Sequence, residues 1–501
     1  MSPCLPIGSR REPFVDDALI ERLSGRAELR LHHPTPREVS LVTDQAWEGN
    51  GTNYVTVFQD GQRYRMYYRG CQYSYLEGRD RPNHPDVYCY AESTDGIHWT
   101  RPDLGLFEWD GSRHNNIVWT GGDGANAENF APFRDTNPAC DPKARYKALG
   151  VGRVGPGLYA AGSPDGIHWS LLAPEPVITL GDFDSHNLGF WDSARGEYRE
   201  YHRQGRSGRD IRTSASADFV TWPEPEFLSY RALVDPGRGS GADADVRDPV
   251  GAAYPQGRVS ELYTNQIAPY HRAPHLLLGF PTRYIDRAWT ESARLLPNHE
   301  YRQVRATRSR REGTAVTDGM LMSSRDRQSF TVWPESFLRP GLRLRDSWFY
   351  GDTYQAWGLV ETNSDLEDAP NELSLYVTER TLQPVPAQLR RYTLRLDGFV
   401  SVRAPLAGGE MLTRTLSFSG ARLEINFATS AAGTLRVEIQ DEGGQAVPGF
   451  TMADCHEQYG DQLDRTVSWA AGSDVSRLSG LPVRLRVELR DADLFALRFV
   501  G

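Results

Sequence analysis

The chain has 501 residues, of which 39% are hydrophobic and 24% charged, with a formal net charge of −10. A chain of this length and apolar content can bury a sizeable core and is expected to hold two domains. The acidic balance argues against nucleic acid or an anionic membrane as the main partner.

Cysteine usage and the N-terminal segment narrow the class further. The five cysteines are scattered and contain no C-x-x-C pair, so they indicate neither a disulfide framework nor a zinc site. Residues 1–6 lack the apolar core of a secretory signal, and no apolar run reaches membrane-spanning length. We expect a protein that is cytoplasmic, or secreted with its signal peptide absent from this sequence.

A seven-residue motif occurs twice, as STDGIHW at Ser93–Trp99 and SPDGIHW at Ser163–Trp169, with weaker copies at 214–222 and 323–333. Each copy follows a strand-like segment and supplies an Asp/Gly turn and an aromatic residue. Recurrence of one such unit is typical of a β-propeller. We interpret Asp95 and Asp165 as turn residues whose carboxylates bond backbone amides.

In chain order the strand-like segments group into five units, which predict an all-β fold with a five-bladed propeller over residues 1–387. We expect residues 14–31 to help close the last blade, because an open sheet edge favours aggregation. The units comprise residues 53–68, 129–161, 187–216, 262–324 and 348–377.

Beyond Glu379 the repeated motif no longer occurs, and residues 382–387 contain two prolines, which interrupt regular structure. Four later segments alternate apolar and polar residues, at 392–396, 422–427, 434–439 and 483–489. This period-two pattern predicts a C-terminal β-sandwich over residues 388–501. It is expected to buttress the propeller, with carbohydrate binding as the alternative.

The innermost strands of a propeller line one central channel, so residues just before them should face a common pocket. Every unit offers a carboxylate there: Glu48, Glu128, Asp184, Glu261 and Asp352. Hydrolysis of a glycosidic bond needs one carboxylic acid and one carboxylate. We therefore expect catalysis at Glu48, Asp184 and Glu261. Expected substrate-binding residues are Trp47, Asn50, Asp182, His186, Asn187, Tyr263, Asn265, His275, Arg283 and Asp352.

The order of the units, the acids before blades one, three and four, and the trailing sandwich resemble the five-bladed hydrolases of glycoside hydrolase families 32, 43 and 68. The likeness is greatest to proteins described as family 32 N-terminal-like. It implies Glu48 as nucleophile or base, Asp184 as the residue that tunes pKa values and holds the sugar, and Glu261 as general acid.

The sequence also departs from that pattern. It has no Trp-Met-Asn-Asp-Pro-Asn-Gly motif at blade one and no Glu-Cys pair at blade four. The triplet Arg247-Asp248-Pro249 matches the Arg-Asp-Pro of these families, but it lies in an insertion at 235–260, and we interpret the match as coincidental.

The sequence therefore predicts a glycoside hydrolase, exo-acting and furanoside-specific, with an oligosaccharide or glycoside as substrate and no nucleic-acid or membrane partner. The alternatives are a non-catalytic carbohydrate-binding propeller and a sialidase-like enzyme, since the repeated turns are similar to sialidase Asp-boxes. The resemblance to sialidases conflicts with the count of five blades, because sialidases have six. No residue spacing predicts a catalytic metal or other cofactor. The sequence is compatible with a structural calcium ion held by oxygen ligands.

Overall fold

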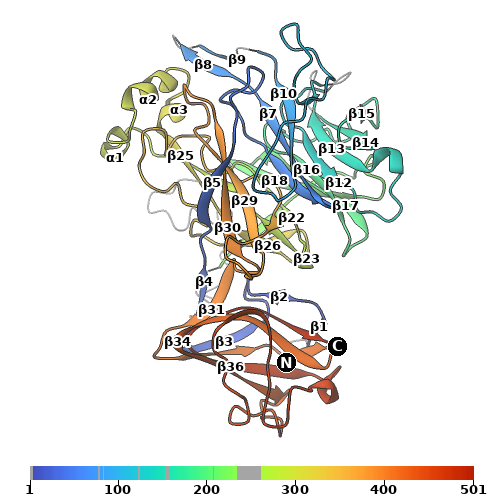
Figure 1. Ribbon diagram of the computed structural model, residues 1–501, viewed down its shortest axis with the longest axis vertical. Coiled ribbons are helices and arrows are strands. Elements are labelled where there is room, and N and C mark those ends of the chain that lie inside the picture. The colour runs from blue at the N-terminus through green and yellow to red at the C-terminus, as the bar shows by residue number, and fades with distance from the viewer. Residues whose placement is uncertain are drawn as a thin grey trace.

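The computed structural model describes residues 4–76, 79–82, 84–121, 125–152, 157–206, 208–233 and 261–501. Within them a propeller built of five blades stands on a ten-stranded C-terminal sheet (Figure 1). The expected all-β class and the five blades are confirmed.

The first three blades are four-stranded antiparallel sheets in which sequence order matches spatial order. Blade one contains β6 (Thr56–Asp60), β7 (Arg63–Gly70), β10 (Val87–Ser93) and β11 (Ile117–Trp119). Blade two contains β12 (Ala131–Arg134), β13 (Tyr146–Val151), β14 (Leu158–Ser163) and β15 (Ser170–Leu171). Blade three contains β16 (Leu188–Asp192), β17 (Glu197–Gly205), β18 (Arg209–Ser216) and β19 (Glu226–Phe227).

Blade four is larger, because a second small sheet extends it. Its main sheet contains β22 (Ala268–Tyr270), β23 (Ala273–Gly279), β26 (Met322–Ser324), β27 (Ser329–Val332) and β20 (Ser229–Ala232). The second sheet contains β21 (Glu261–Leu262), β24 (Thr282–Asp286) and β25 (Ala315–Gly319). Between β24 and β25 lie three short helices, α1 (Glu291–Arg294), α2 (His299–Ala306) and α3 (Arg310–Thr314). These helices and the hairpin of β8 (Tyr73–Leu76) and β9 (Arg79–Pro82) lie at the end of the propeller away from the C-terminal sheet (Figure 1).

Blade five is closed by the N-terminal part of the chain, but not by the segment that the sequence suggested. Its strands are β28 (Val360–Thr362), β29 (Glu372–Glu379), β30 (Gln388–Arg395) and β5 (Thr35–Val42). The outer strand β5 pairs with β30, with Leu41 opposite Leu389. Residues 20–31 pair instead with the C-terminal sheet, so the expectation that 14–31 closes the last blade is wrong.

The repeated turns have one hydrogen-bond pattern in blades one to four. In blade one, Asp95 Oδ1 accepts from the backbone N–H groups of Ile97 and His98, each at 2.8 Å. Asp165, Asp218 and Asp326 accept from the amides two and three residues ahead in the same way. The architectural role expected for Asp95 and Asp165 is thus what the structure shows, and the two weaker sequence copies are true copies of the turn.

The C-terminal sheet joins both ends of the chain. Its strands are β1 (Leu5–Gly8), β2 (Glu12–Pro13), β3 (Ile20–Gly25), β4 (Glu28–Leu31), β31 (Val400–Ala404), β32 (Gly409–Thr413), β33 (Leu416–Phe418), β34 (Arg422–Asp441), β35 (Asp461–Thr466) and β36 (Val483–Val500). The register of β34 against β36 shifts between Thr429 and Thr434, and Asp491 opposite has a positive φ of 43°. Both halves of each long strand contribute to one apolar core, so the sheet folds over it as a sandwich.

These pairings bear on the expected division at residue 387. Strand β30 (Gln388–Arg395) is the third strand of blade five, and residues 5–31 belong with the C-terminal sheet. By strand pairing the two parts of the chain therefore meet near Leu396. That each part is an independent domain stays a prediction.

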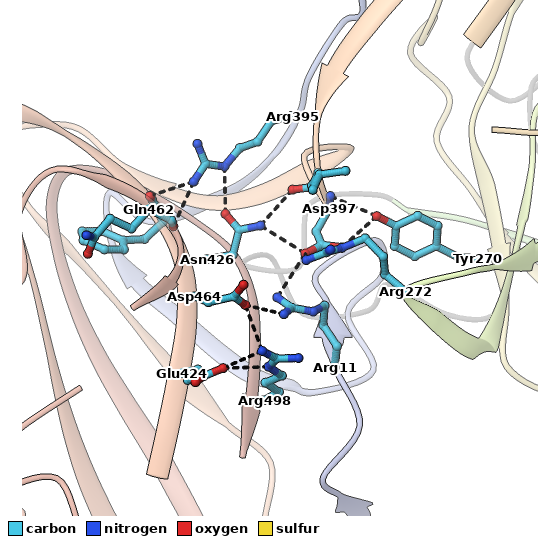
Figure 2. Close-up of polar contacts among 12 residues, drawn as sticks. Arg11, Tyr270, Arg272, Arg395, Asp397, Glu424, Asn426, Gln462, Asp464 and Arg498 are labelled. Atoms are coloured by element: carbon cyan, nitrogen blue, oxygen red, sulfur yellow. Dashed lines mark hydrogen bonds and ion pairs between the residues drawn. The ribbon is translucent and has the colours of Figure 1, made fainter. Parts of the chain in front are cut away.

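A buried ionic network joins the two parts at Asp397, in the turn between β30 and β31 (Figure 2). Its carboxylate accepts from Arg272 Nε at 2.9 Å and the Tyr270 hydroxyl at 2.7 Å, both from blade four, and from Asn426 Nδ2 at 3.1 Å on β34. Arg11 of the N-terminal segment donates to it at 3.2 Å. Burial by itself would raise the pKa of Asp397, but the bond from Arg272 and the charges of Arg272 and Arg11 outweigh it and hold the pKa below its usual value.

Candidate active site

The starts of the innermost strands converge at the end of the channel that carries α1–α3 and the β8–β9 hairpin. We call this end the mouth and define it by Tyr54, Glu128, Asp184, Arg203 and Tyr263. Arg203 Nη2 on β17 lies 2.8 Å from Asp184 Oδ2 in the turn before β16. The Arg203 side chain is buried, whereas that of Asp184 is 63% exposed. Asp184 therefore presents its carboxyl group to solvent, and the buried Arg203 side chain holds it in place.

Glu128, directly before blade two, is the second carboxylate of the mouth. Burial raises its pKa, and the nearby negative charges of Asp86 and Asp184 raise it further, against the opposing charge of Arg69. Arg69 Nη2 lies 3.5 Å from Glu128 Oε1, and the Glu128 side chain keeps 38% of its exposure. The mouth thus holds two carboxyl groups, each beside an arginine. Asp184 is the more exposed and lies 2.8 Å from its arginine, whereas Glu128 lies 3.5 Å from its own and has a pKa raised by burial.

Tyrosine side chains pack together beside these carboxyl groups. The Tyr350 hydroxyl donates to the Tyr263 hydroxyl at 2.7 Å, and Tyr263 packs against Tyr284 and Tyr354 with ring centroids 6.3 and 5.4 Å away. The guanidinium of Arg209 lies 4.7 Å from the Tyr263 ring centroid. Aromatic faces and guanidinium groups are surfaces on which a sugar ring and its hydroxyls can be held.

Several buried polar atoms near the mouth have no hydrogen-bond partner in the described part of the chain: Asn53 Oδ1, Asn129 Oδ1, Arg203 Nη1 and the Tyr284 hydroxyl. A buried polar atom without a partner costs free energy, and such groups gather where a ligand or water supplies the partner. Their position beside Glu128 and Asp184 supports a binding function for the mouth.

The backbone is strained at the same place. In blades one, three, four and five the chain enters its inner strand through a non-glycine residue with positive φ: Tyr54 (57°), Phe183 (54°), Gln266 (45°) and Thr353 (61°). Each left-handed residue costs on the order of 1 kcal/mol, and such strain tends to cluster at functional sites.

Glu48 lies apart from this arrangement. Its side chain is fully buried, and its oxygens accept from Tyr68 at 2.5 Å, from Arg101 at 2.7 and 3.0 Å and from the Gln45 amide at 3.1 Å. The structure therefore gives Glu48 no exposed carboxylate oxygen. Trp47 beside it donates to Asn116 Oδ1 at 2.7 Å.

Most other expected binding residues make contacts within the protein. Asn50 Nδ2 donates to the carbonyls of Tyr73 and Gln383, and Asn265 Nδ2 to those of His186 and Tyr201. Arg283 pairs with Asp318, and His275 lies 3.2 Å from Glu12 next to the C-terminal sheet. Asp352 accepts from the backbone amides of Thr381 and Phe349.

The polar run before blade three contributes to the mouth through Asp184. Asp182 accepts from the Gly205 amide at 2.5 Å, and Asn187 Nδ2 donates to the carbonyls of Phe183 and Ser185. His186 is fully buried on the channel axis, and burial lowers its pKa to about 3. It is therefore neutral at physiological pH.

Two sequence predictions fall outside the described residues. The side chain of Glu261 is one, although its backbone pairs with Tyr284 of the tyrosine group. The triplet Arg247-Asp248-Pro249 is the other.

Four residues of the site were not among the functional residues predicted from the sequence: Tyr54, Glu128, Arg203 and Arg209. Glu128 is one of the carboxylates directly before an inner strand, and that position in the sequence could have identified it as a candidate site residue. Arg203 and Arg209 are brought to the mouth by the pairing of β17 with β18, in which Gly205 lies opposite Arg209. No local sequence pattern marks either arginine.

Across the described ranges, no group of three or more His, Cys, Asp or Glu side chains is placed to hold a metal ion. Among those same residues, no helix has the length and apolar character needed to cross a membrane.

Comparison with known proteins gives matches to part of the chain. No family model matches the chain. An uncharacterized protein of Mycobacterium tuberculosis (strain CDC 1551 / Oshkosh) is 31% identical over 150 residues, which are 29% of this chain and 40% of that protein. An uncharacterized protein of strain ATCC 25618 / H37Rv matches with the same identity and coverage. The match thus spans about two fifths of the length of these relatives.

Solved structures resemble the chain at low identity. An N-acetylgalactosamine deacetylase from F. plautii is 12% identical, covers 73% of this chain and 94% of its own, and has a TM-score of 0.44. A family 43 arabinoxylan arabinofuranohydrolase from Bacillus subtilis is 12% identical, with 94% and 99% coverage and a TM-score of 0.39. A family 32 β-fructofuranosidase from Bombyx mori is 12% identical, with 94% coverage of both chains and a TM-score of 0.38. The five-bladed architecture expected from the sequence rests on the strand pairings given above.

Proposed function

We propose that the protein is a glycoside hydrolase in which Glu128 is the general acid and Asp184 the base or nucleophile. The observation that carries the proposal is the contrast between two carboxyl groups at one channel mouth. Glycosidic cleavage requires such a pair, one protonated and one ionised.

The environment of Glu128 suits the acid. Because burial raises its pKa, the group keeps its proton to higher pH than an exposed glutamate and can deliver it to the leaving oxygen. The charge of Asp184 adds to this effect, so the ionised partner helps to keep the acid protonated.

The environment of Asp184 suits the base or nucleophile. Arg203 lies 2.8 Å from its carboxylate and fixes its position, and its 63% exposure leaves the carboxylate within reach of water or an anomeric carbon. Tyr263 and the neighbouring tyrosines offer a wall for the sugar ring.

We further propose exo-action on a furanoside, as in a fructofuranosidase or arabinofuranosidase. The helical insertion between β24 and β25 lies at the mouth end (Figure 1). An insertion that closes one side of the mouth favours action on a chain end. Three alternatives remain as outcomes of the test: a carbohydrate-binding propeller without activity, a sialidase-like hydrolase, and a glycosidase that uses Glu48 and Glu261.

The test is a panel of aryl glycosides, including furanosides and a sialoside, together with oligosaccharides, assayed for released aglycone and reducing ends. Glu128→Gln should lower kcat on oligosaccharides by about 10²- to 10⁴-fold but spare activated aryl glycosides, whose leaving oxygen needs little protonation. Asp184→Asn should abolish turnover of both.

The controls separate the competing assignments. The exposed Glu175→Gln should leave all rates unchanged. Wild-type activity on oligosaccharides should fall as pH rises through the raised pKa of Glu128, and that limb should vanish in Glu128→Gln. Leaving-group dependence that appears in Glu261→Gln instead would transfer the acid role to Glu261. No turnover on any substrate would favour the binding-only function.

A further inference from the structure

We infer that the opposite end of the propeller channel is a second, independent binding site that takes a small, uncharged aromatic molecule of the phenol or naphthol class. A cavity of about 470 Å³ opens there, and all five blades line it. Its walls include Val57, Phe133, Phe190, Ala268 and Trp357. We call it the far cavity.

The far cavity is separated from the mouth by packed side chains on the channel axis. His186 Nδ1 lies 3.2 Å from Gln266 Oε1, and its ring packs against Tyr54 on the mouth side and Trp357 on the far side, with centroids 5.8 and 6.2 Å away. The Trp357 backbone forms two hydrogen bonds with blade one. Its N–H donates to the Val55 carbonyl at 2.7 Å, and its carbonyl accepts from the Val57 N–H at 2.8 Å. A ligand in the far cavity therefore makes no contact with Glu128 or Asp184.

The walls of the far cavity favour an aromatic ring. Phe133 meets Trp357 edge to face, with centroids 6.4 Å apart, and Phe190 and Phe280 add two further aromatic rings to the wall. An apolar cavity of about 150 Å³ is enough to bind benzene, so the far cavity has room for a bicyclic ring. Pockets of this size lined by aromatic residues are characteristic of small-molecule sites.

The charges around the far cavity favour an uncharged ligand. Arg134 lies 3.4 Å from Asp60, and His271 lies 2.8 Å from Glu361. The Arg134 guanidinium and the His271 ring at the rim thus each already have a carboxylate partner. Neither a carboxylate nor an ammonium group on the ligand would find an uncompensated opposite charge on these residues.

The polar groups of the far cavity favour few hydroxyls on the ligand. Gln266 Nε2 donates to the Gln355 carbonyl at 2.7 Å, and its oxygen faces His186, so this buried side chain is already satisfied. Other polar side chains, such as Thr136 and Ser193, are exposed at the rim. A sugar would bury several hydroxyls without partners, which is costly, whereas a phenol can keep its single hydroxyl at the rim.

The experiment is a titration of the full-length protein with 2-naphthol, phenol and, as the polyhydroxylated comparison, glucose, followed by calorimetry and ligand-observed NMR. Ser193→Trp places a bulky ring at the exposed rim and should weaken 2-naphthol binding at least about tenfold. Ala268→Trp, which fills the cavity from β22, should do the same and guards against a local effect at residue 193. Ser419→Trp, on an exposed turn of the C-terminal sheet, is the matched control and should bind like the wild type.

The mouth variant makes the result independent of the proposed hydrolase activity. Asp184→Asn should leave 2-naphthol affinity unchanged, since the axial side chains separate the two sites. The inference is overturned if no aromatic probe binds saturably, if both cavity-blocking variants bind like the wild type, or if glucose binds there in preference to 2-naphthol. Loss of binding in Asp184→Asn would likewise overturn it, because the probe would then occupy the mouth.

Discussion

Asp352 is a carboxyl group whose protonation is controlled by its burial before blade five. The Thr381 and Phe349 amides donate to its two oxygens at 3.0 and 3.3 Å. Burial nevertheless raises its pKa from 3.8 to about 7. A carboxyl group with a raised folded-state pKa stabilises the fold fully below its unfolded pKa, and this contribution is lost as pH rises through the folded value.

We therefore predict that Asp352→Asn flattens the pH dependence of stability. Between pH 4 and pH 8 the free energy of unfolding of the wild type should fall relative to that of the variant, by up to about 4 kcal/mol. Urea unfolding of both proteins across this range measures the difference. Parallel pH profiles would mean that Asp352 is ionised in the folded protein.

The candidate site could be predicted from the sequence only in part, and the residues show why. The position of a residue before an inner strand is visible in the sequence, and this led to Asp184 and Tyr263, which lie at the mouth. Burial and pairing are not visible there. Glu48 occupies an equivalent place in the chain, yet Arg101 and Tyr68 enclose its carboxylate. Arg203 acts from the middle of a strand, where only the register places it.

At the scale of elements, neighbouring blades are locked by tyrosine hydroxyls. Tyr67 on β7 donates to the Gly166 carbonyl in the repeated turn of blade two, and Tyr201 on β17 donates to the Arg327 carbonyl in that of blade four, each at 2.9 Å. Tyr376 on β29 donates to Gly96 in the turn of blade one. The repeated turn thus offers a fixed carbonyl to the second strand of an adjacent blade.

We predict that Tyr201→Phe lowers the free energy of unfolding by about 1 to 2 kcal/mol, because it leaves the buried Arg327 carbonyl without this donor. Thermal and urea unfolding measure the loss. Tyr159→Phe is the control, since that hydroxyl has no hydrogen-bond partner among the described residues, and it should cost less than about 0.5 kcal/mol. Equal effects of the two changes would show that the lock contributes nothing.

Some secondary-structure elements can be predicted from sequence patterns, whereas the pairing of distant strands cannot. The Asp turn is a local device whose hydrogen bonds span three residues, so even its weak copies at 214–222 and 323–333 were recognisable. Pairing between distant strands is not local. The alternation in Gln388–Arg395 suits a blade and a sandwich equally, and its pairing with Glu372–Glu379 and Thr35–Val42 assigns it to blade five.

At the scale of the whole molecule, the propeller and the C-terminal sheet share contacts that neither makes alone. The Asp397 network crosses between them (Figure 2). An apolar cluster does so as well, in which Phe399 packs on Phe280 and Phe337 of blade four with centroids 6.0 and 6.3 Å apart. The first and last described strands, β1 and β36, both belong to the C-terminal sheet (Figure 1), so the propeller is an insertion between the strands of that sheet.

Two truncations that differ by one strand test whether the propeller is an independent domain. Residues 34–396 retain every strand of blade five, whereas residues 34–387 lack β30, which leaves β29 with an open edge and β5 without its partner. We predict that 34–396 unfolds in one cooperative transition, with reduced solubility because Phe280 and Phe337 become exposed. The shorter fragment should show no cooperative transition, because an unclosed ring loses the packing of its first blade on its last. Differential scanning calorimetry and near-UV circular dichroism distinguish the two.

If both fragments fail to fold, the cluster around Phe399 is a core that the two parts share, and the chain is one cooperative unit. If both fold, ring closure through β5 contributes little to the stability of the propeller.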